Sequence, residues 1–184
     1  MSAAFDPESF DKRDKSEVAE IESIVNRLHR KMQLDEIVQT TTNDLIGFLK
    51  VDRVVVYHFY KRWEGRVTFE SLSSKAFSIL GSTGPDDCFN GDYAQMYLAG
   101  RVRAIANIAT AEIAPCHRDF LHKLKVKANL VVPIVTGQNT TGQKLWGLLV
   151  AHHCRSTREW LTADIEKMQA GALRLAAAPS VQES

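Results

Sequence analysis

Two stretches late in the chain are apolar on both of their alternating faces, and they constrain the fold more than any other feature. They span residues 127–135, KANLVVPIV, and residues 144–154, KLWGLLVAHHC. A β-strand that is apolar on both sides lies within a sheet that is covered on each face. The fold must therefore provide two covering layers around these strands.

Amphipathic helices at the two ends of the chain can provide one of these layers. Ser16 is suited to cap a first helix, in which apolar residues recur at spacings of three and four as far as Met32. A second helix is expected over residues 35–49, and a closing helix starts near Leu161 with Thr162 as its N-cap. The same spacing is typical of seams between paired helices, so it also suggests a homodimer through the terminal helices.

The middle of the chain carries the remaining strands. Residues 51–60 and the segment from Gly65 are rich in β-branched and aromatic residues, with a hairpin connection at 61–64. A further strand is expected over 101–108 and a short helix over 116–123. This order predicts an α+β fold with a central antiparallel sheet and the terminal helices on one face. One domain over 17–178 is expected, between a flexible N-terminal lead-in at 1–16 and a C-terminal tail at 179–184.

The composition argues against several classes of function. Among 184 residues, 23 Lys and Arg stand against 22 Asp and Glu, and this near-neutral charge does not favour nucleic acid as a partner. No apolar run approaches the roughly 20 residues of a membrane span, and the N-terminus has no apolar signal segment. We therefore expect no membrane insertion and a cytoplasmic location. The motifs of phosphate-binding, dinucleotide-binding and serine-hydrolase sites are absent from the sequence.

Cys116 is the residue best placed for chemistry. It stands at the start of the expected short helix, in PCHRDFL, and His117 follows it directly. A helix N-terminus and a neighbouring imidazolium both lower the pKa of a thiol and make it a better nucleophile. The three cysteines lie in different local contexts, which suggests free thiols rather than a disulfide framework. The alternative is that Cys116 is a small buried apolar residue.

A second cysteine lies in a long loop. Residues 81–92, GSTGPDDCFNGD, consist mostly of turn formers and include Asp86, Cys88 and Phe89. Loops of this length are usually functional. A cysteine on such a loop can approach and leave a ligand, and the aspartate two residues away can accept hydrogen bonds from it. The alternative is a structural turn in which Phe89 is a buried anchor.

A third candidate site ends the last strand, in AHHC. Strand alternation places His152 and Cys154 on the same face as Trp146, and His153 on the opposite face. His152 can therefore line a pocket, while Cys154 is expected in the core. No metal site is expected, because the histidines and cysteines lack the spacings of zinc ligands.

Taken in order, these motifs resemble a known family. DDCF, GRVRAIANI, APCHRDFL, KANLVVPI and LWGLLVAHHCRSTREW, followed by the closing helix, are similar to the GAF domains of cyanobacteriochromes of the phytochrome superfamily, in particular to the subgroup named for its Asp-x-Cys-Phe motif. The resemblance covers roughly residues 17–178. It implies a GAF fold with a covalent linear tetrapyrrole, phycocyanobilin or phycoviolobilin or both, in a pocket on the sheet face opposite the terminal helices.

The resemblance also implies roles for individual residues. Cys116 would hold the bilin through a stable thioether beside His117, and Cys88 would add reversibly at the central methine bridge. Asp86 would accept hydrogen bonds from pyrrole N–H groups. The other residues implied to contact the bilin are Phe89, Arg101 and Arg103 as candidates for the propionates, and His152 near the D-ring.

These roles describe a light-sensing domain. Light would isomerise the bilin between its 15Z and 15E forms, and release of Cys88 would convert a blue-absorbing state into a green-, teal- or orange-absorbing one. We expect no enzymatic activity apart from autocatalytic bilin attachment. Two alternatives stay open: a GAF domain that binds another small ligand or only dimerises, and a cysteine hydrolase that uses Cys116 and His117.

Overall fold

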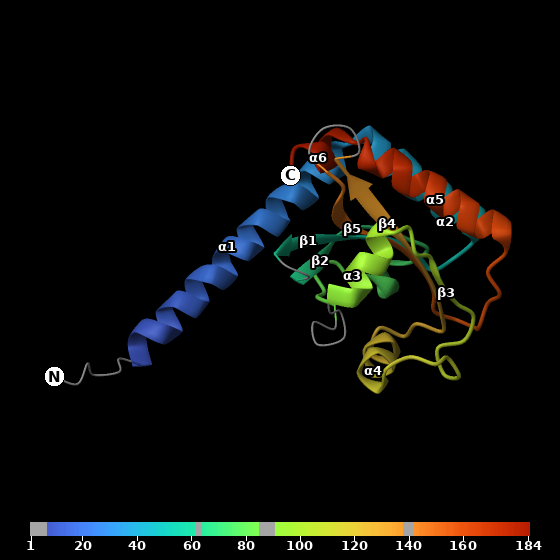
Figure 1. Ribbon diagram of the computed structural model, residues 1–184, viewed down its shortest axis with the longest axis horizontal. Helices are drawn as coiled ribbons and strands as arrows, with labels where there is room; N and C mark the ends of the chain where they lie inside the picture. Colours follow the sequence, from blue (N-terminus) through green and yellow to red (C-terminus); the bar gives the residue numbers. More distant parts are fainter. Residues whose placement is uncertain (1–6, 62–63, 85–90, 138–141) are drawn as a thin grey trace.

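The computed structural model describes residues 7–61, 64–84, 91–137 and 142–184. Within these ranges the strands lie between two groups of helices (Figure 1). The elements, in chain order, are α1 (Pro7–Leu34), α2 (Glu36–Leu49), β1 (Arg53–Lys61), β2 (Glu64–Leu72), the 3₁₀ helix η1 (Lys75–Phe77), α3 (Gly91–Leu98), β3 (Arg103–Ile105), α4 (Pro115–Lys123), β4 (Ala128–Thr136), β5 (Lys144–His153), α5 (Thr162–Ala176) and α6 (Pro179–Gln182).

The strands form one antiparallel sheet in the order β2-β1-β5-β4-β3. β5 lies at its centre, where Val150 is opposite Val55 of β1 on one side and Val131 of β4 on the other. Nearly every residue of β4 and β5 is buried or partly buried. The prediction that these strands are covered on both faces is confirmed, and with it the α+β architecture.

One face of the sheet, called the helix face below, is covered by α2, α5 and the second half of α1. Figure 1 shows α2 and α5 side by side over the strands, while the first half of α1 extends away from them. The core on this face includes Met32 of α1, Leu149 of β5 and Met168 of α5, and none of the three has exposed surface. Tight packing of this kind contributes most of the stability of a small domain.

The apolar seams of the terminal helices serve this core. Met168, Ala172 and Leu175 of α5 all belong to the helix-face cluster, so the seam that suggested a partner helix packs on the chain's own sheet. On α1, Met32 is buried in the same cluster, while Val18 is 44% exposed. The reason given for dimerisation through α5 is therefore wrong, and a homodimer through the exposed part of α1 stays a prediction.

Both ends of the chain carry more helix than the sequence pattern indicates. α1 begins at Pro7 rather than at Ser16, because proline suits the first turn of a helix and the charged residues that follow are good helix formers. α5 is capped at Leu161 rather than Thr162. The carboxylate of Asp164 accepts a hydrogen bond of 3.1 Å from the Leu161 amide.

The residues expected to form a C-terminal tail belong to the domain. α6 lies within 179–184, and Val181 is only 1% exposed. The Ser180 amide donates to Asp35 Oδ2 over 2.8 Å, and the other carboxylate oxygen of Asp35 caps α2. One buried carboxylate thus connects the last helix to the second, so the folded unit reaches past residue 178.

A β-bulge in the last strand changes which side of the sheet Trp146 points to. The pairing of β4 with β5 shifts by one residue between Ile134 and Val135, and Trp146 is the extra residue. Trp146 therefore joins the helix-face cluster, and the prediction that it shares a face with His152 is wrong. The next residue, Gly147, has to lack a side chain, because a Cβ atom there would lie 2.2 Å from a backbone oxygen of β1.

The sequence pattern also misses or mispredicts elements on the sheet face opposite the helix face. α3 and η1 were not expected at all, and β3 has three residues instead of the eight of 101–108. α3 is short and follows a stretch of turn formers, so neither its length nor its context gives a clear helix pattern. These elements border the cavities described next.

Candidate functional site

The sheet face opposite the helix face, called the cavity face, is covered by α3 and α4 and is incompletely filled. An apolar cavity of about 110 Å³ lies against β1, β4 and β5, where its lining includes Val55, Leu148 and His152. A second cavity of about 480 Å³, called the arginine cavity, is lined by Arg101 and Arg103 among others. The two cavities share four lining residues, namely Tyr97, His117, Asn129 and Val131. They therefore adjoin, and together they offer an elongated site with an apolar end and a basic end.

α4 places two of the predicted site residues at the rim of these cavities. The helix begins with Pro115 at its first position, and its buried Leu121 holds it against the domain. Cys116 is exposed on the first turn, and its sulfur takes part in a disulfide. The expectation that every cysteine is a free thiol is therefore wrong for Cys116. His117 is half-buried and lines both cavities.

The protonation of His117 differs from the one assumed in reading the sequence. Burial, together with the positive charge of Arg103, lowers the pKa of His117 below its ordinary value. The neutral imidazole is therefore favoured near neutral pH, and it does not act as the imidazolium invoked to activate Cys116. The helix N-terminus remains as the feature that would lower the pKa of a reduced Cys116 thiol.

Arg101 and Arg103 both line the arginine cavity, together with Glu112. The guanidinium of Arg101 lies 5.5 Å from the ring centroid of Tyr93, and Arg103 Nη2 donates to the carbonyl oxygen of Glu112 over 3.3 Å. Within the described ranges neither arginine forms an ion pair with a carboxylate. The cavity therefore favours an anionic group, and the planar fork of arginine suits a carboxylate.

His152 lies at the floor of the apolar cavity, as the strand pattern predicted. It is 4% exposed, and its Nδ1 accepts a hydrogen bond of 2.8 Å from Nε of Arg53. Burial holds the pKa of His152 well below its ordinary value, and the positive charge of Arg53 and the electrostatic interaction with His117 lower it further. The ring is therefore neutral.

Three predicted site residues, Asp86, Cys88 and Phe89, lie outside the described residues. The part of their loop that is described reaches the apolar cavity, which Thr83 and Gly84 help to line. The Gly84 amide donates to Tyr57 Oη over 2.8 Å. A Cβ atom at this position would lie 2.6 Å from that oxygen, so a larger residue would have to displace the Tyr57 side chain. The loop is thus attached to β1 beside the cavity.

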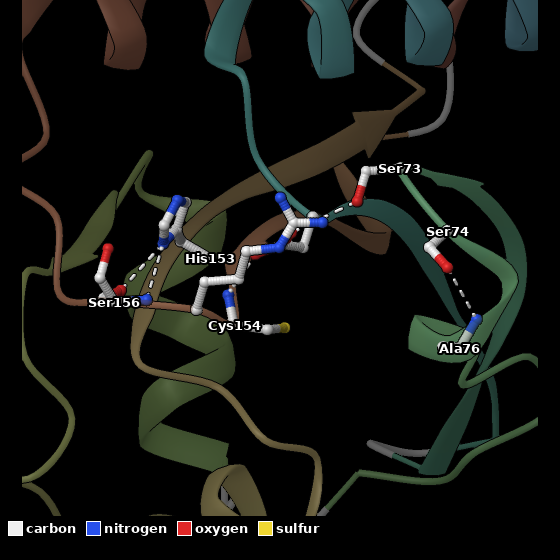
Figure 2. A network of polar contacts seen from close by, with 8 residues as sticks. Ser73, Ser74, Ala76, His153, Cys154 and Ser156 are labelled. Atoms are coloured by element: carbon white, nitrogen blue, oxygen red, sulfur yellow. Dashed lines mark hydrogen bonds and ion pairs between the residues drawn. The ribbon is translucent and has the colours of Figure 1, made fainter.

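Cys154 belongs to the fold, as predicted. It is a free cysteine, 8% exposed, and its amide donates to Asp52 Oδ2 over 2.7 Å. Figure 2 shows it at the end of β5 next to the contact between His153 and Ser156, where His153 Nδ1 lies 2.9 Å from the Ser156 carbonyl oxygen. Burial raises the pKa of the Cys154 thiol, which disfavours the nucleophilic thiolate.

The described part of the chain contains no group of three His, Cys, Asp or Glu side chains placed to hold a metal ion. None of its helices is both long enough and apolar enough to cross a membrane. The longest of them, α1, is rich in charged residues.

The arrangement of an antiparallel sheet with helices on one face and a ligand-sized cavity on the other agrees with a comparison against protein families. Residues 33–178 match the model of the GAF domain family. This chain is a GAF domain. The fold predicted from the order of its motifs is thereby confirmed.

Relatives of this GAF domain occur in cyanobacteria. An uncharacterised protein of Picosynechococcus sp. is 48% identical over 150 residues, which are 82% of this chain and 89% of that protein. A putative methyl-accepting chemotaxis protein of Synechocystis sp. is 35% identical over 158 residues, which are 84% of this chain but 15% of that protein. The GAF domain thus corresponds to nearly all of the first relative and to a small part of the second.

Solved structures of similar GAF domains include pigment-bearing ones. The blue-light absorbing form of the PixJ GAF domain of Thermosynechococcus elongatus is 33% identical, with a TM-score of 0.68 over 80% of this chain and 86% of that one. The phycocyanobilin-bound GAF domain of a cyanobacterial phytochrome is 29% identical, with a TM-score of 0.65 over 85% of this chain and 91% of that one. The similarity therefore extends to cyanobacteriochrome and phytochrome GAF domains.

Two buried polar residues, the cross-strand partners of His152, are not predicted from the sequence. Arg53 lies in a strand and is 2% exposed, and nothing in its local pattern predicts that it contacts His152. Asn129 is 3% exposed and lines both cavities. A signal for Asn129 existed, because it is the one strongly polar residue within the otherwise apolar 128–135.

Proposed function

We propose that this GAF domain is a bilin-binding light sensor. The observation that carries the proposal is the pair of adjoining cavities on the cavity face, apolar at one end and lined by Arg101 and Arg103 at the other. A linear tetrapyrrole has a matching shape and chemistry, with a long conjugated body and two carboxylates. The similarity to the PixJ GAF domain supports the same assignment.

The residues of this chain would hold such a group in distinct ways. Arg101 and Arg103 would pair with its two carboxylates, and His117 would pack beside its body from the first turn of α4. Cys116 would hold it covalently, since a thiol adds across a carbon–carbon double bond to give a thioether, with its proton transferred to the second carbon of that bond. This step needs the reduced thiol, so attachment requires prior reduction of the Cys116 disulfide by a thiol reductant.

The bound pigment would supply absorption of visible light and a 15Z/15E isomerisation. We propose phycocyanobilin, with or without conversion to phycoviolobilin, as the pigment. Cys88 would form a second, reversible thioether that gives the blue-absorbing state of an Asp-x-Cys-Phe domain, with Asp86 as hydrogen-bond acceptor and Phe89 beside them. No enzymatic reaction beyond attachment is assigned to the domain, and any output activity would reside in another domain.

The experiment is to add phycocyanobilin to the purified, dithiothreitol-reduced protein and to record absorption spectra before and after illumination. The proposal expects coloured protein whose spectrum converts reversibly, and zinc-induced fluorescence of the denatured protein on a gel. Protein that stays colourless would instead favour a GAF domain that binds another small ligand or only dimerises. A Cys88→Ala variant that keeps the blue-absorbing state would contradict the second thioether alone.

A further inference from the structure

One buried arginine connects three segments around the apolar cavity. Arg53 of β1 is 2% exposed and lies behind the residues that line the cavity. Its Nε donates to Nδ1 of His152 over 2.8 Å. Its two terminal nitrogens donate to backbone carbonyl oxygens, Nη1 to that of Phe77 over 2.8 Å and Nη2 to that of Leu124 over 2.7 Å. These lengths are typical of strong hydrogen bonds from a charged donor, so Arg53 holds the three segments at a fixed spacing.

The three partners of Arg53 belong to different sides of the cavity. His152 at the floor and Leu124 both line it. Phe77 is the last residue of η1, and the segment that follows it lines the cavity from Ile79 onward. Arg53 therefore joins the floor of the cavity to two of its walls, one of which carries α4.

Few contacts within the described part of the chain hold α4 in place. Leu121 is the only buried residue of this helix. Figure 1 shows α4 apart from α2 and α5, connected to β3 and β4 by segments without regular structure. Leu124 directly follows the last residue of α4. The hydrogen bond from Arg53 Nη2 thus connects the C-terminal end of the helix to the sheet.

The backbone just past α4 shows the same constraint. Lys125 has a φ of 60°, in the left-handed region that favours glycine. Its amide donates to the His122 carbonyl oxygen over 2.9 Å, and the Val126 amide donates to that of Leu121 over 2.9 Å, so the helix ends in a Schellman motif. A residue with a side chain keeps this conformation only where its surroundings enforce it. The carbonyl group directly before Lys125 is the one that Arg53 binds.

We propose that Arg53 positions α4, and with it Cys116, for covalent attachment of the pigment. The inference rests on the proposed function, in which the Cys116 sulfur bonds to one carbon of a double bond in the pigment and the thiol proton moves to the other carbon. Such a step is fast only when the reacting atoms are held at the right distance, and a misplacement of about 1 Å can slow it by about 100-fold. Arg53 binds at the opposite end of α4 from Cys116, so it acts through the helix as a positioning residue.

The positioning of α4 is tested on the reduced protein without pigment, by hydrogen exchange of backbone amides. Arg53→Met keeps an unbranched apolar side chain and removes the guanidinium. The amides of Lys125 and Val126 should exchange about tenfold faster than in the parent, relative to the amide of Leu149 at the centre of the sheet, because the end of α4 loses a hydrogen bond to the sheet. Exchange of both amides at the rate of the parent would overturn the inference, and this result does not depend on pigment binding.

Arg158→Met is the matched control. Arg158 is another arginine whose side chain is mostly buried and donates to a backbone carbonyl oxygen, that of Leu49, and it lines neither cavity. Its loss should lower the melting temperature as the loss of a structural arginine does. The relative exchange of the Lys125 and Val126 amides should stay within about twofold of the parent.

The effect on attachment is tested by the time course of phycocyanobilin attachment at several pigment concentrations, with dithiothreitol present. In Arg53→Met, the maximal rate per folded molecule should fall by about tenfold, while the half-saturating concentration should stay within about twofold. Arg158→Met should keep both values. A role confined to the cavity floor at His152 would instead raise the half-saturating concentration at an unchanged maximal rate, and that result would overturn the inference.

The outcomes separate this inference from the proposed function. A parent protein that attaches no phycocyanobilin overturns both. If the parent attaches the pigment and Arg53→Met attaches it equally fast, only the positioning role fails. Should Arg53→Met not fold, Arg53→Lys takes its place, because lysine keeps the charge but lacks the planar fork that reaches partners in three directions. Arg53→Lys should also attach the pigment more slowly, and attachment at the rate of the parent would overturn the positioning role.

Discussion

The helix face and the cavity face of the sheet each contain a buried histidine, and the two rings are used in different ways. His58, on the helix face, packs on Trp146 with the ring centroids 4.3 Å apart, and its Nδ1 donates to the Trp146 carbonyl oxygen over 3.1 Å. His152, on the cavity face, accepts at Nδ1 from Arg53. His58 is therefore protonated at Nδ1, whereas the neutral His152 is protonated at Nε2. Two neutral histidines of similar burial thus hold opposite tautomers.

The difference extends to the packing around the two histidines. Fully buried side chains such as Leu149 and Met168 fill the centre of the helix face, while a cavity of about 200 Å³ lies between β4 and α5; on the cavity face, space lies directly against Leu148, Val150 and His152. A filled core stabilises the fold, while space and unsatisfied polar groups lower stability unless a ligand uses them. The comparison therefore assigns stability chiefly to the packed centre of the helix face and recognition to the space in front of His152.

The largest expected effect is on covalent attachment. Cys116→Ala should lose all bilin that survives denaturation, because only a thioether persists after unfolding. Zinc-induced fluorescence of the reduced, phycocyanobilin-treated protein on a denaturing gel measures this. Cys154→Ala is the matched control at the other described cysteine and should keep the fluorescence. Fluorescence retained in Cys116→Ala would show that the attachment site lies elsewhere.

The second prediction compares neighbouring leucines of β5 that face opposite ways. Leu149→Ala on the helix face should lower the free energy of unfolding by about 2 to 5 kcal/mol, because Leu149 is fully buried in a filled core. Leu148→Ala, at the wall of the cavity, should cost clearly less, since part of its surface already faces open space. Urea denaturation of the protein without pigment measures both. Equal losses would mean that the two faces contribute equally to stability.

The third prediction concerns pH. Burial lowers the pKa of His58 to about 4 from 6.5, so between these values the unfolded chain binds more protons than the folded one. The contribution of His58 to stability is complete above pH 6.5 and falls by about 3 kcal/mol as the pH decreases to about 4. In this pH window, the slope of the unfolding free energy against pH should correspond to about one fewer proton taken up on unfolding in His58→Phe than in the parent protein. An unchanged slope would show that His58 does not titrate as a buried base.

The smallest effect is expected for the loop beside the cavity. Tyr57→Phe removes the hydroxyl that accepts from the Gly84 amide, and it should lower the free energy of unfolding by about 1 kcal/mol or less. Exchange of the Gly84 amide hydrogen should accelerate, because that N–H loses its partner. Tyr60→Phe, which removes a hydroxyl from the same strand at a residue outside the cavity lining, is the matched control and should leave the exchange of the Gly84 amide unchanged. Unchanged exchange in Tyr57→Phe would show that the loop is held by other contacts.

The sequence by itself determined the order and type of most elements. Strands that are apolar on both faces required covering layers, and the helix periodicities of 35–49 and 162–175 supplied one, because local spacing fixes which side of an element is apolar. The position of Cys116 and His117 at the first turn of α4 followed from a proline and a short helical pattern. Strand alternation from Leu148 to His152 gives His152 the face that lines the cavity, but the same alternation fails across the bulge at Trp146.

Only the tertiary structure decided what these residues contact. The facing of Trp146 depends on a bulge between β4 and β5, and the neutral state of His117 depends on burial and on Arg103 from another element. Strand register places His152 directly beside Arg53, which is 99 residues away in the sequence, and beside Asn129, which is 23 residues away. Register and desolvation arise from contacts between distant segments, so no local pattern encodes them, and the recognition chemistry of the cavity face becomes visible only once the sheet is assembled.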